Sequence, residues 1–98
     1  MQIKAAIIGL GIMGRRMLEH MQRHPNFSVA AIWDLDSYAS RAAQEIAPTA
    51  WPAASAKDAM TAADLVYLAC PPIPRTAYTL EAAAKGKAVF IEKPLGID

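Results

Sequence analysis

Three glycines near the start of the chain have the spacing of a turn that binds the pyrophosphate of a dinucleotide. They are Gly9, Gly11 and Gly14, with Ile12 and Met13 between the last two. Gly9 would permit a tight turn, Gly11 would let a pyrophosphate approach the backbone, and Gly14 would let a helix pack closely on a strand. The amide groups of Ile12 and Met13, at the start of that helix, would favour a phosphate. On the hexapeptide alone, a strand-to-helix turn that merely tolerates glycine is an equally good interpretation.

An aspartate follows at the distance that this chemistry requires. Asp34 lies about 20 positions after Gly14, where an acidic residue accepts hydrogen bonds from the adenosine ribose and repels a 2′-phosphate. Residues 35–38 contain no Arg or Lys, so the sequence favours NAD over NADP. Asp34 could instead be an ordinary strand-end or helix-capping residue, but Asp36 or Ser37 could cap the next helix equally well and leave Asp34 for the ribose.

The elements around these residues decide between the alternatives. An apolar run at Ile3–Ile8 predicts a buried strand, residues 12–24 predict an amphipathic helix, and Phe27–Trp33 predict a second strand. Further helices are expected over residues 38–47, 55–62 and 74–85, and further strands over residues 49–51, 64–69 and 88–91. This alternation predicts an α/β fold with one Rossmann-like domain over residues 1–98, a doubly wound parallel sheet with strand order 3-2-1-4-5.

The fourth predicted strand leads into a proline-rich segment, residues 70–74. Three prolines there predict a stiff, extended exit from the strand. Ligands bind at the carboxyl ends of the strands in such sheets, so Cys70 and Pro71 are candidates for contact with the cofactor. A small, buried apolar side chain is the alternative interpretation of Cys70.

Composition narrows the class of protein. The 98 residues are 54% hydrophobic, carry a net charge of +1 and include one cysteine. Interspersed charges do not indicate a nucleic-acid partner, and no apolar run is long enough for a membrane span. One cysteine excludes an internal disulfide and a cysteine-based zinc cluster and is typical of a reducing compartment. We therefore expect a cytoplasmic protein without a metal site.

Three segments together resemble a known family. They are residues 9–14, Asp64-Leu65-Val66 leading to Pro71-Pro72, and Gly86-Lys87 followed by Phe90-Ile91-Glu92-Lys93-Pro94-Leu95. The chain resembles the N-terminal domain of the Gfo/Idh/MocA oxidoreductases, which include glucose–fructose oxidoreductase and inositol dehydrogenase. The resemblance implies that Lys93 lies beside the nicotinamide and the substrate and assists catalysis. It also implies that Glu92 contacts the nicotinamide-side ribose.

The resemblance implies an NAD-dependent oxidoreductase. Its reaction would be hydride transfer between NAD(H) and a small hydroxyl or carbonyl substrate, sugar- or polyol-like. Family members continue into a sixth strand and a second α/β domain that supplies substrate contacts, a catalytic histidine and most of the oligomer interface. We therefore expect an N-terminal part of a longer, homo-oligomeric enzyme that is inactive alone. The alternative is a non-catalytic NAD(P)-binding sensor of the same fold, although the presence of Lys93 favours an enzyme.

Overall fold

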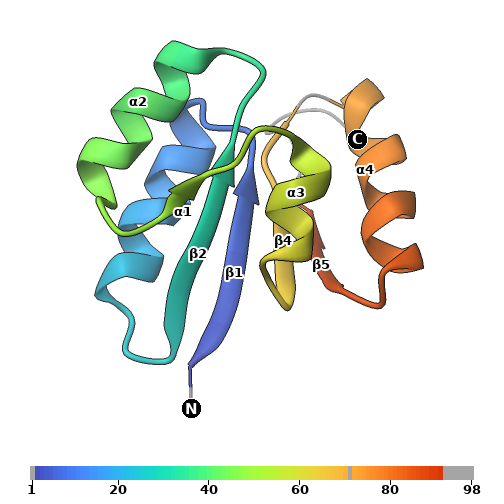
Figure 1. The fold of residues 1–98 in the computed structure, drawn as a ribbon, viewed down its shortest axis with the longest axis horizontal. Coiled ribbons are helices and arrows are strands. Elements are labelled where there is room, and N and C mark those ends of the chain that lie inside the picture. The colour runs from blue at the N-terminus through green and yellow to red at the C-terminus, as the bar shows by residue number, and fades with distance from the viewer. Residues whose placement is uncertain (1, 71, 92–98) are drawn as a thin grey trace.

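Strands and helices alternate along the chain (Figure 1). The computed structural model describes residues 2–70 and 72–91, without the side chains of residues 72–75. The elements are β1 (Ile3–Ile8), α1 (Ile12–Arg23), β2 (Phe27–Trp33), α2 (Ser37–Ile46), β3 (Trp51–Pro52), α3 (Ala56–Thr61), β4 (Leu65–Leu68), α4 (Pro72–Ala84) and β5 (Ala88–Ile91).

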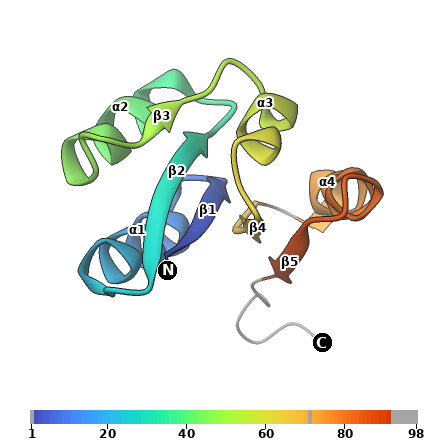
Figure 2. The same ribbon diagram turned by 60° about the horizontal axis from the view of Figure 1, so that its bottom comes forward.

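The sheet confirms the predicted topology. Its five strands run in the order β3-β2-β1-β4-β5 (Figure 2), and every neighbouring pair is parallel. Because β1 lies in the middle, the turn that follows it is flanked by the carboxyl ends of β2 and β4. This places residues 9–14, hereafter the glycine turn, at the point where the strand order reverses.

Both faces of the central strands are buried. In β1, Ile7 packs in a core with α1 and α2, whereas Ile8 packs in a second core with α3 and α4. Successive residues of a strand point to opposite faces, so a strand covered on both sides is a continuous apolar run. The prediction of a central strand from such a run is thus confirmed.

Side-chain caps fix the starts of two helices. The Asp36 carboxylate accepts a hydrogen bond from the Tyr38 amide (2.9 Å), at the start of α2. The Ser55 hydroxyl accepts one from the Asp58 amide (3.0 Å), at the start of α3. Each bond satisfies an amide that the helix itself leaves unpaired. At the end of α4, Gly86 has a φ of 72°, the left-handed conformation that is common for the residue that terminates a helix.

Two predictions about prolines were wrong. The third strand is Trp51–Pro52 instead of residues 49–51, because an edge strand tolerates a residue without an amide proton. The fourth helix begins at Pro72 instead of Pro74. Proline has the φ of a helix and needs no hydrogen-bond acceptor in the first turn, so prolines 72 and 74 open the helix instead of extending the strand.

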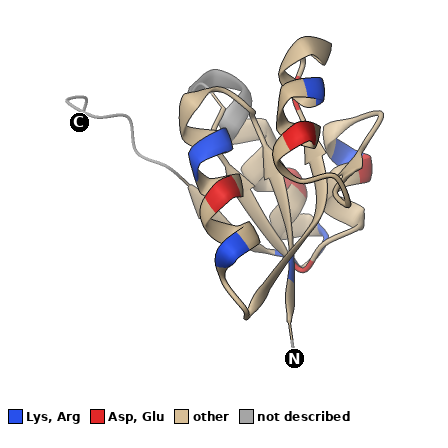
Figure 3. Cartoon of the chain, turned by 90° about the vertical axis from the view of Figure 1, so that its left-hand side faces the viewer, with Lys and Arg blue, Asp and Glu red and all other residues tan. Residues whose placement is uncertain are grey.

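Charged residues are dispersed over the surface. On the face drawn in Figure 3, basic and acidic positions are interspersed along the helices. The electrostatics near the glycine turn therefore depend on individual side chains. Over residues 2–70 and 72–91, none of the helices has the length and apolar character needed to cross a membrane.

Candidate functional site

The backbone turns sharply at Gly9 as it leaves β1. Its φ is 99°, a conformation that strongly favours glycine. A Cβ atom here would lie 2.8 Å from the carbonyl carbon of Ala69 and 2.8 Å from the amide nitrogen of Cys70. Both the dihedral angle and the close approach of the β4 exit thus require glycine.

The other two glycines face opposite surroundings. A Cβ atom on Gly14 would overlap the carbonyl oxygen of Gly9, so glycine allows α1 to pack directly against the turn. A Cβ atom on Gly11 would meet nothing within 4 Å. The predicted tight turn and close packing are found at Gly9 and Gly14, and Gly11 leaves the open side that a phosphate would need.

The start of α1 presents amide groups to this open side. The first hydrogen bond of the helix runs from the Arg15 amide to the Gly11 carbonyl (2.9 Å). The amides of Ile12 and Met13 precede that bond, and no side chain caps the helix at Gly11. Together with the helix dipole, these donors form an anion-binding end.

Asp34 lies beside the turn, but its carboxylate is already engaged. Its Oδ2 accepts the amide of Leu10 (2.6 Å) and its Oδ1 accepts the amide of Asp36 (2.8 Å). Of the two capping residues considered, Asp36 caps α2, and Asp34 does not. The role of Asp34 toward a ribose stays a prediction, and its carboxylate already has two backbone partners. Each carboxylate oxygen can accept a second bond, so a ribose hydroxyl would join an existing network.

A cavity of about 530 Å³ opens beside Asp34. We call it the Asp34 cavity; its lining residues are Trp33, Asp34, Leu35, Ser37, Ser40, Arg41, Gln44, Pro52, Ala53 and Ala54. Arg41 was missed by the sequence analysis, which considered only the four residues after Asp34. One helical turn returns Arg41 to the face of Ser37, and its guanidinium lies 5.8 Å from the centre of the Tyr38 ring. Arg41 therefore adds a positive charge to the same cavity as the Asp34 carboxylate.

Tyr78 of α4 is a second residue that the sequence analysis missed. Its ring meets the edge of Trp33 with the centroids 6.0 Å apart. Burial raises the pKa of Tyr78, and the negative charges of Cys70, Glu81 and Asp34 raise it further. Tyr78 therefore links α4 to the end of β2, and no apolar periodicity would have identified its role.

The remaining predicted residues are placed only in part. Cys70 is partly buried and packs against the core shared with α3 and α4, as expected for a small packed side chain. Its amide lies against the glycine turn, and its contact with a cofactor stays a prediction. Pro71, Glu92 and Lys93 lie outside the described residues. Among the residues that are described, no group of three or more His, Cys, Asp or Glu side chains could hold a metal ion.

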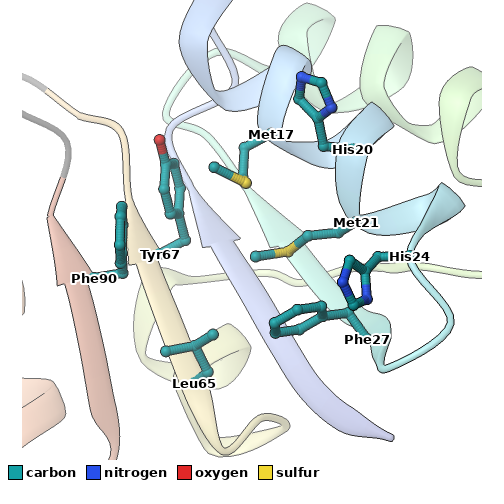
Figure 4. A pocket seen from close by; sticks show the side chains of 8 residues that line it. All are labelled: Met17, His20, Met21, His24, Phe27, Leu65, Tyr67 and Phe90. Atoms are coloured by element: carbon teal, nitrogen blue, oxygen red, sulfur yellow. The ribbon is translucent and has the colours of Figure 1, made fainter.

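A second cavity, of about 250 Å³, lies on the α1 side of β4 and β5. We call it the sheet groove; it is lined by Met17, His20, Met21, His24, Phe27, Leu65, Tyr67 and Phe90 (Figure 4). Tyr67 and Phe90 stack with centroids 5.3 Å apart. The accessible lining is mostly apolar, unlike the start of α1 with its open amide groups.

The comparison with curated proteins finds a clear relative. A protein of Amycolatopsis mediterranei (strain S699), named "Putative UDP-kanosamine synthase oxidoreductase subunit", is 39% identical over 98 residues. The match covers 97% of this chain and 27% of the relative.

Solved structures of two oxidoreductases contain a region with the same fold as this chain. Myo-inositol dehydrogenase from Lactobacillus casei, in complex with NAD(H) and myo-inositol, is 27% identical with a TM-score of 0.89. That match covers 97% of this chain and 29% of the other. A 3-ketoreductase from Actinomadura kijaniata, in complex with NADP, has the same fold with a TM-score of 0.85 and 23% identity, over 97% of this chain and 31% of its own. The chain thus spans less than a third of the length of each of these three proteins.

The family comparison covers nearly the whole chain. The model of the Gfo/Idh/MocA family, described as an oxidoreductase family with an NAD-binding Rossmann fold, matches residues 3–98. That range includes the glycine turn and Asp34, and it extends through the segment of Glu92 and Lys93. The chain therefore belongs to the Gfo/Idh/MocA oxidoreductase family and carries its NAD-binding Rossmann fold.

Proposed function

We propose that this chain is the NAD(H)-binding part of an oxidoreductase that acts on a hydroxyl or carbonyl group of a sugar- or polyol-like substrate. The observation that carries the proposal is the joining of the glycine turn to Asp34, through the Leu10 amide. This contact holds the open amide groups at the start of α1 and the Asp34 carboxylate at one edge of the sheet, which supports binding of a phosphate and a ribose there. Family membership and the dehydrogenases among its relatives support the reaction type.

The residues present fit a dinucleotide. The amides of Ile12 and Met13 would hold the pyrophosphate, Gly11 would leave room for it, and Asp34 would accept the adenosine ribose hydroxyls. When bound, the nicotinamide supplies the hydride donor or acceptor. We favour NAD over NADP because the Asp34 carboxylate would repel a 2′-phosphate, although Arg41 in the same cavity reduces this repulsion.

The catalytic role is proposed for Lys93 on the family resemblance alone. An ammonium group beside the reacting carbon would stabilise negative charge on the substrate oxygen and pass on its proton. Glu92 would contact the nicotinamide-side ribose, and Cys70 with Pro71 would border the cofactor. The alternative, a non-catalytic NAD(P)-binding sensor, predicts binding of the same nucleotide without any need for Lys93.

Calorimetric titration of the chain with NADH and with NADPH tests the cofactor proposal. We expect tighter binding of NADH, and weaker binding of NADH by Asp34→Ala, because the ribose loses its acceptor. Binding of neither nucleotide by a chain that circular dichroism shows to be folded would contradict the proposal. Tighter binding of NADPH would contradict the NAD preference and would make Arg41→Ala the next variant.

The activity of the whole protein is a separate proposal. We propose that residues 1–98 form one domain of a longer, homo-oligomeric, cytoplasmic enzyme with a small-molecule substrate and without a nucleic-acid or membrane partner. The chain alone should show no dehydrogenase turnover, because the substrate contacts would come from elsewhere. Turnover of inositols or nucleotide sugars by the purified chain would contradict this expectation. In the longer protein, turnover that Lys93→Ala abolishes without loss of NADH binding would support the enzyme over the sensor.

A further inference from the structure

Asp34 joins two loops that are 24 residues apart in the sequence. Its Oδ2 accepts the Leu10 amide of the glycine turn, and its Oδ1 accepts the Asp36 amide ahead of α2. The residue before it adds a backbone bond, because the Trp33 carbonyl accepts the Gly9 amide (2.8 Å). Two consecutive amides of the turn are therefore tied to two consecutive residues at the end of β2.

On the β4 side, the glycine turn is held only at its first residue, Gly9. The Ile8 carbonyl accepts the Ala69 amide (2.9 Å), and Gly9 lies against the β4 exit. Gly11 then enters open space. In the described part of the chain, the bond between Leu10 and Asp34 is the last hydrogen bond that ties the turn to another element before α1 begins. It is thus placed to set the direction of the backbone that leads to the open amides of Ile12 and Met13.

The geometry points to Asp34 as a positioning residue for the phosphate site: it holds the glycine turn in its binding shape before a nucleotide arrives, in addition to any contact with the ribose. This inference rests on the proposed function. A hydrogen bond from an amide to a carboxylate is stronger than a bond between neutral groups. A preformed site also loses less conformational entropy when the ligand binds. Loss of the carboxylate should therefore weaken the binding of a nucleotide that has no ribose hydroxyls at all.

Titration with ADP and with 2′,3′-dideoxy-ADP separates positioning from ribose contact. Followed by NMR, Asp34→Ala should weaken binding of the dideoxy nucleotide by about tenfold, the effect of one charge-assisted hydrogen bond. Asp36→Ala is the matched control: it removes the same charge two residues away and a helix cap at Tyr38. That control leaves the acceptor of Leu10 in place, so it should change binding of the dideoxy nucleotide by less than about twofold.

The amide protons give a readout that does not depend on a ligand. In the unchanged chain, the Leu10 amide should exchange slowly with solvent, and Asp34→Ala should make it exchange rapidly while the Ile7 amide stays protected. If Asp34→Ala does not fold, Asp34→Asn replaces it; its single acceptor oxygen can keep only one of the two amides, so an intermediate loss of affinity is expected.

These measurements distinguish a positioning role of Asp34 from a contact with the ribose alone. If Asp34→Ala weakens ADP but leaves the dideoxy nucleotide within about twofold, Asp34 is a ribose contact only and the inference is overturned. Rapid exchange of the Leu10 amide in the unchanged chain would overturn it as well. If the unchanged chain binds neither ADP nor NADH, the proposed function fails, and the exchange of the Leu10 amide still tests the positioning role.

Discussion

Gly9, Gly11 and Gly14 share a residue type but differ in what a methyl group would meet. At Gly14 it would overlap the carbonyl oxygen of Gly9, whereas at Gly11 it would enter open space. The first effect concerns folding, since α1 would have to move away from the turn. The second concerns only a ligand that approaches the backbone. The two substitutions to alanine should therefore separate stability from binding.

We expect Gly14→Ala to lower the free energy of unfolding by about 1–3 kcal/mol, the usual cost of overpacking. Gly11→Ala should cost less than about 1 kcal/mol, the range for an alanine at a helix N-cap, yet it should weaken NADH binding at least about tenfold because its methyl group occupies the phosphate side. Urea unfolding and calorimetry measure the two quantities. Equal losses of stability in both variants would contradict the assignment of the two roles.

At the scale of residues, the sequence predicts the glycines and Asp34 because side-chain type and spacing determine them. It does not predict the partners of Asp34, because the donors are backbone amides of Leu10 and Asp36, and every residue except proline has such a donor. The sequence analysis also missed Arg41, for a different reason. Its place in the Asp34 cavity depends on where α2 begins, and a helix returns a residue to the same face after three or four positions.

At the scale of elements, apolar runs and caps predict most of the order and extent of strands and helices, and they fail where proline is involved. Pro52 lies in an edge strand and Pro72 opens a helix. Proline restricts one dihedral angle and removes one donor, which is compatible with both settings. Only the neighbouring elements, here the edge of β2 and the sheet face under α4, decide which setting is adopted.

The contact between α4 and β2 has a consequence for stability at high pH. Burial and nearby negative charges raise the pKa of Tyr78, so the folded chain disfavours the phenolate more than the unfolded chain does. The folded state thus retains its proton where the unfolded state begins to lose it. Stability should be unaffected well below pH 10 and should fall as the pH rises from about 10, the ordinary tyrosine pKa, through the raised value.

Tyr78→Phe tests this expectation. The variant should lose less stability than the unchanged chain between about pH 9 and pH 11, because it has no phenol to ionise at this position. Thermal unfolding across that interval provides the measurement, and Tyr38→Phe serves as the control since Tyr38 is largely exposed. An identical pH dependence in the unchanged chain and in Tyr78→Phe would show that Tyr78 does not contribute.

At the scale of the whole molecule, the two faces of the sheet are covered unequally. The face of β4 toward α4 is fully packed at Val66 and Leu68, whereas Phe90 on the opposite face of β5 remains 53% exposed and lines the sheet groove. Parallel sheets are usually buried on both faces. Substitutions on the two faces should therefore have different costs.

Leu68→Ala should destabilise the chain by about 2–5 kcal/mol, because Leu68 is fully buried. Phe90→Ala should cost less than about 2 kcal/mol, roughly half the usual loss for a buried phenylalanine. Denaturant titration at two protein concentrations gives both values. A loss at Phe90 as large as that at Leu68, growing with concentration, would show that association covers this face in solution.

The position of Trp33 has an optical consequence. Trp33 lies directly before Asp34, borders the Asp34 cavity and meets Tyr78, while Trp51, the chain's other indole, is half exposed in the neighbouring edge strand. Indole emission overlaps the absorption of reduced nicotinamide, so energy transfer to a bound NADH would quench it. The chain thus carries an internal fluorophore at the rim of the proposed site, and Trp33→Phe should reduce the quenching to the part that Trp51 contributes while leaving NADH affinity measurable by calorimetry.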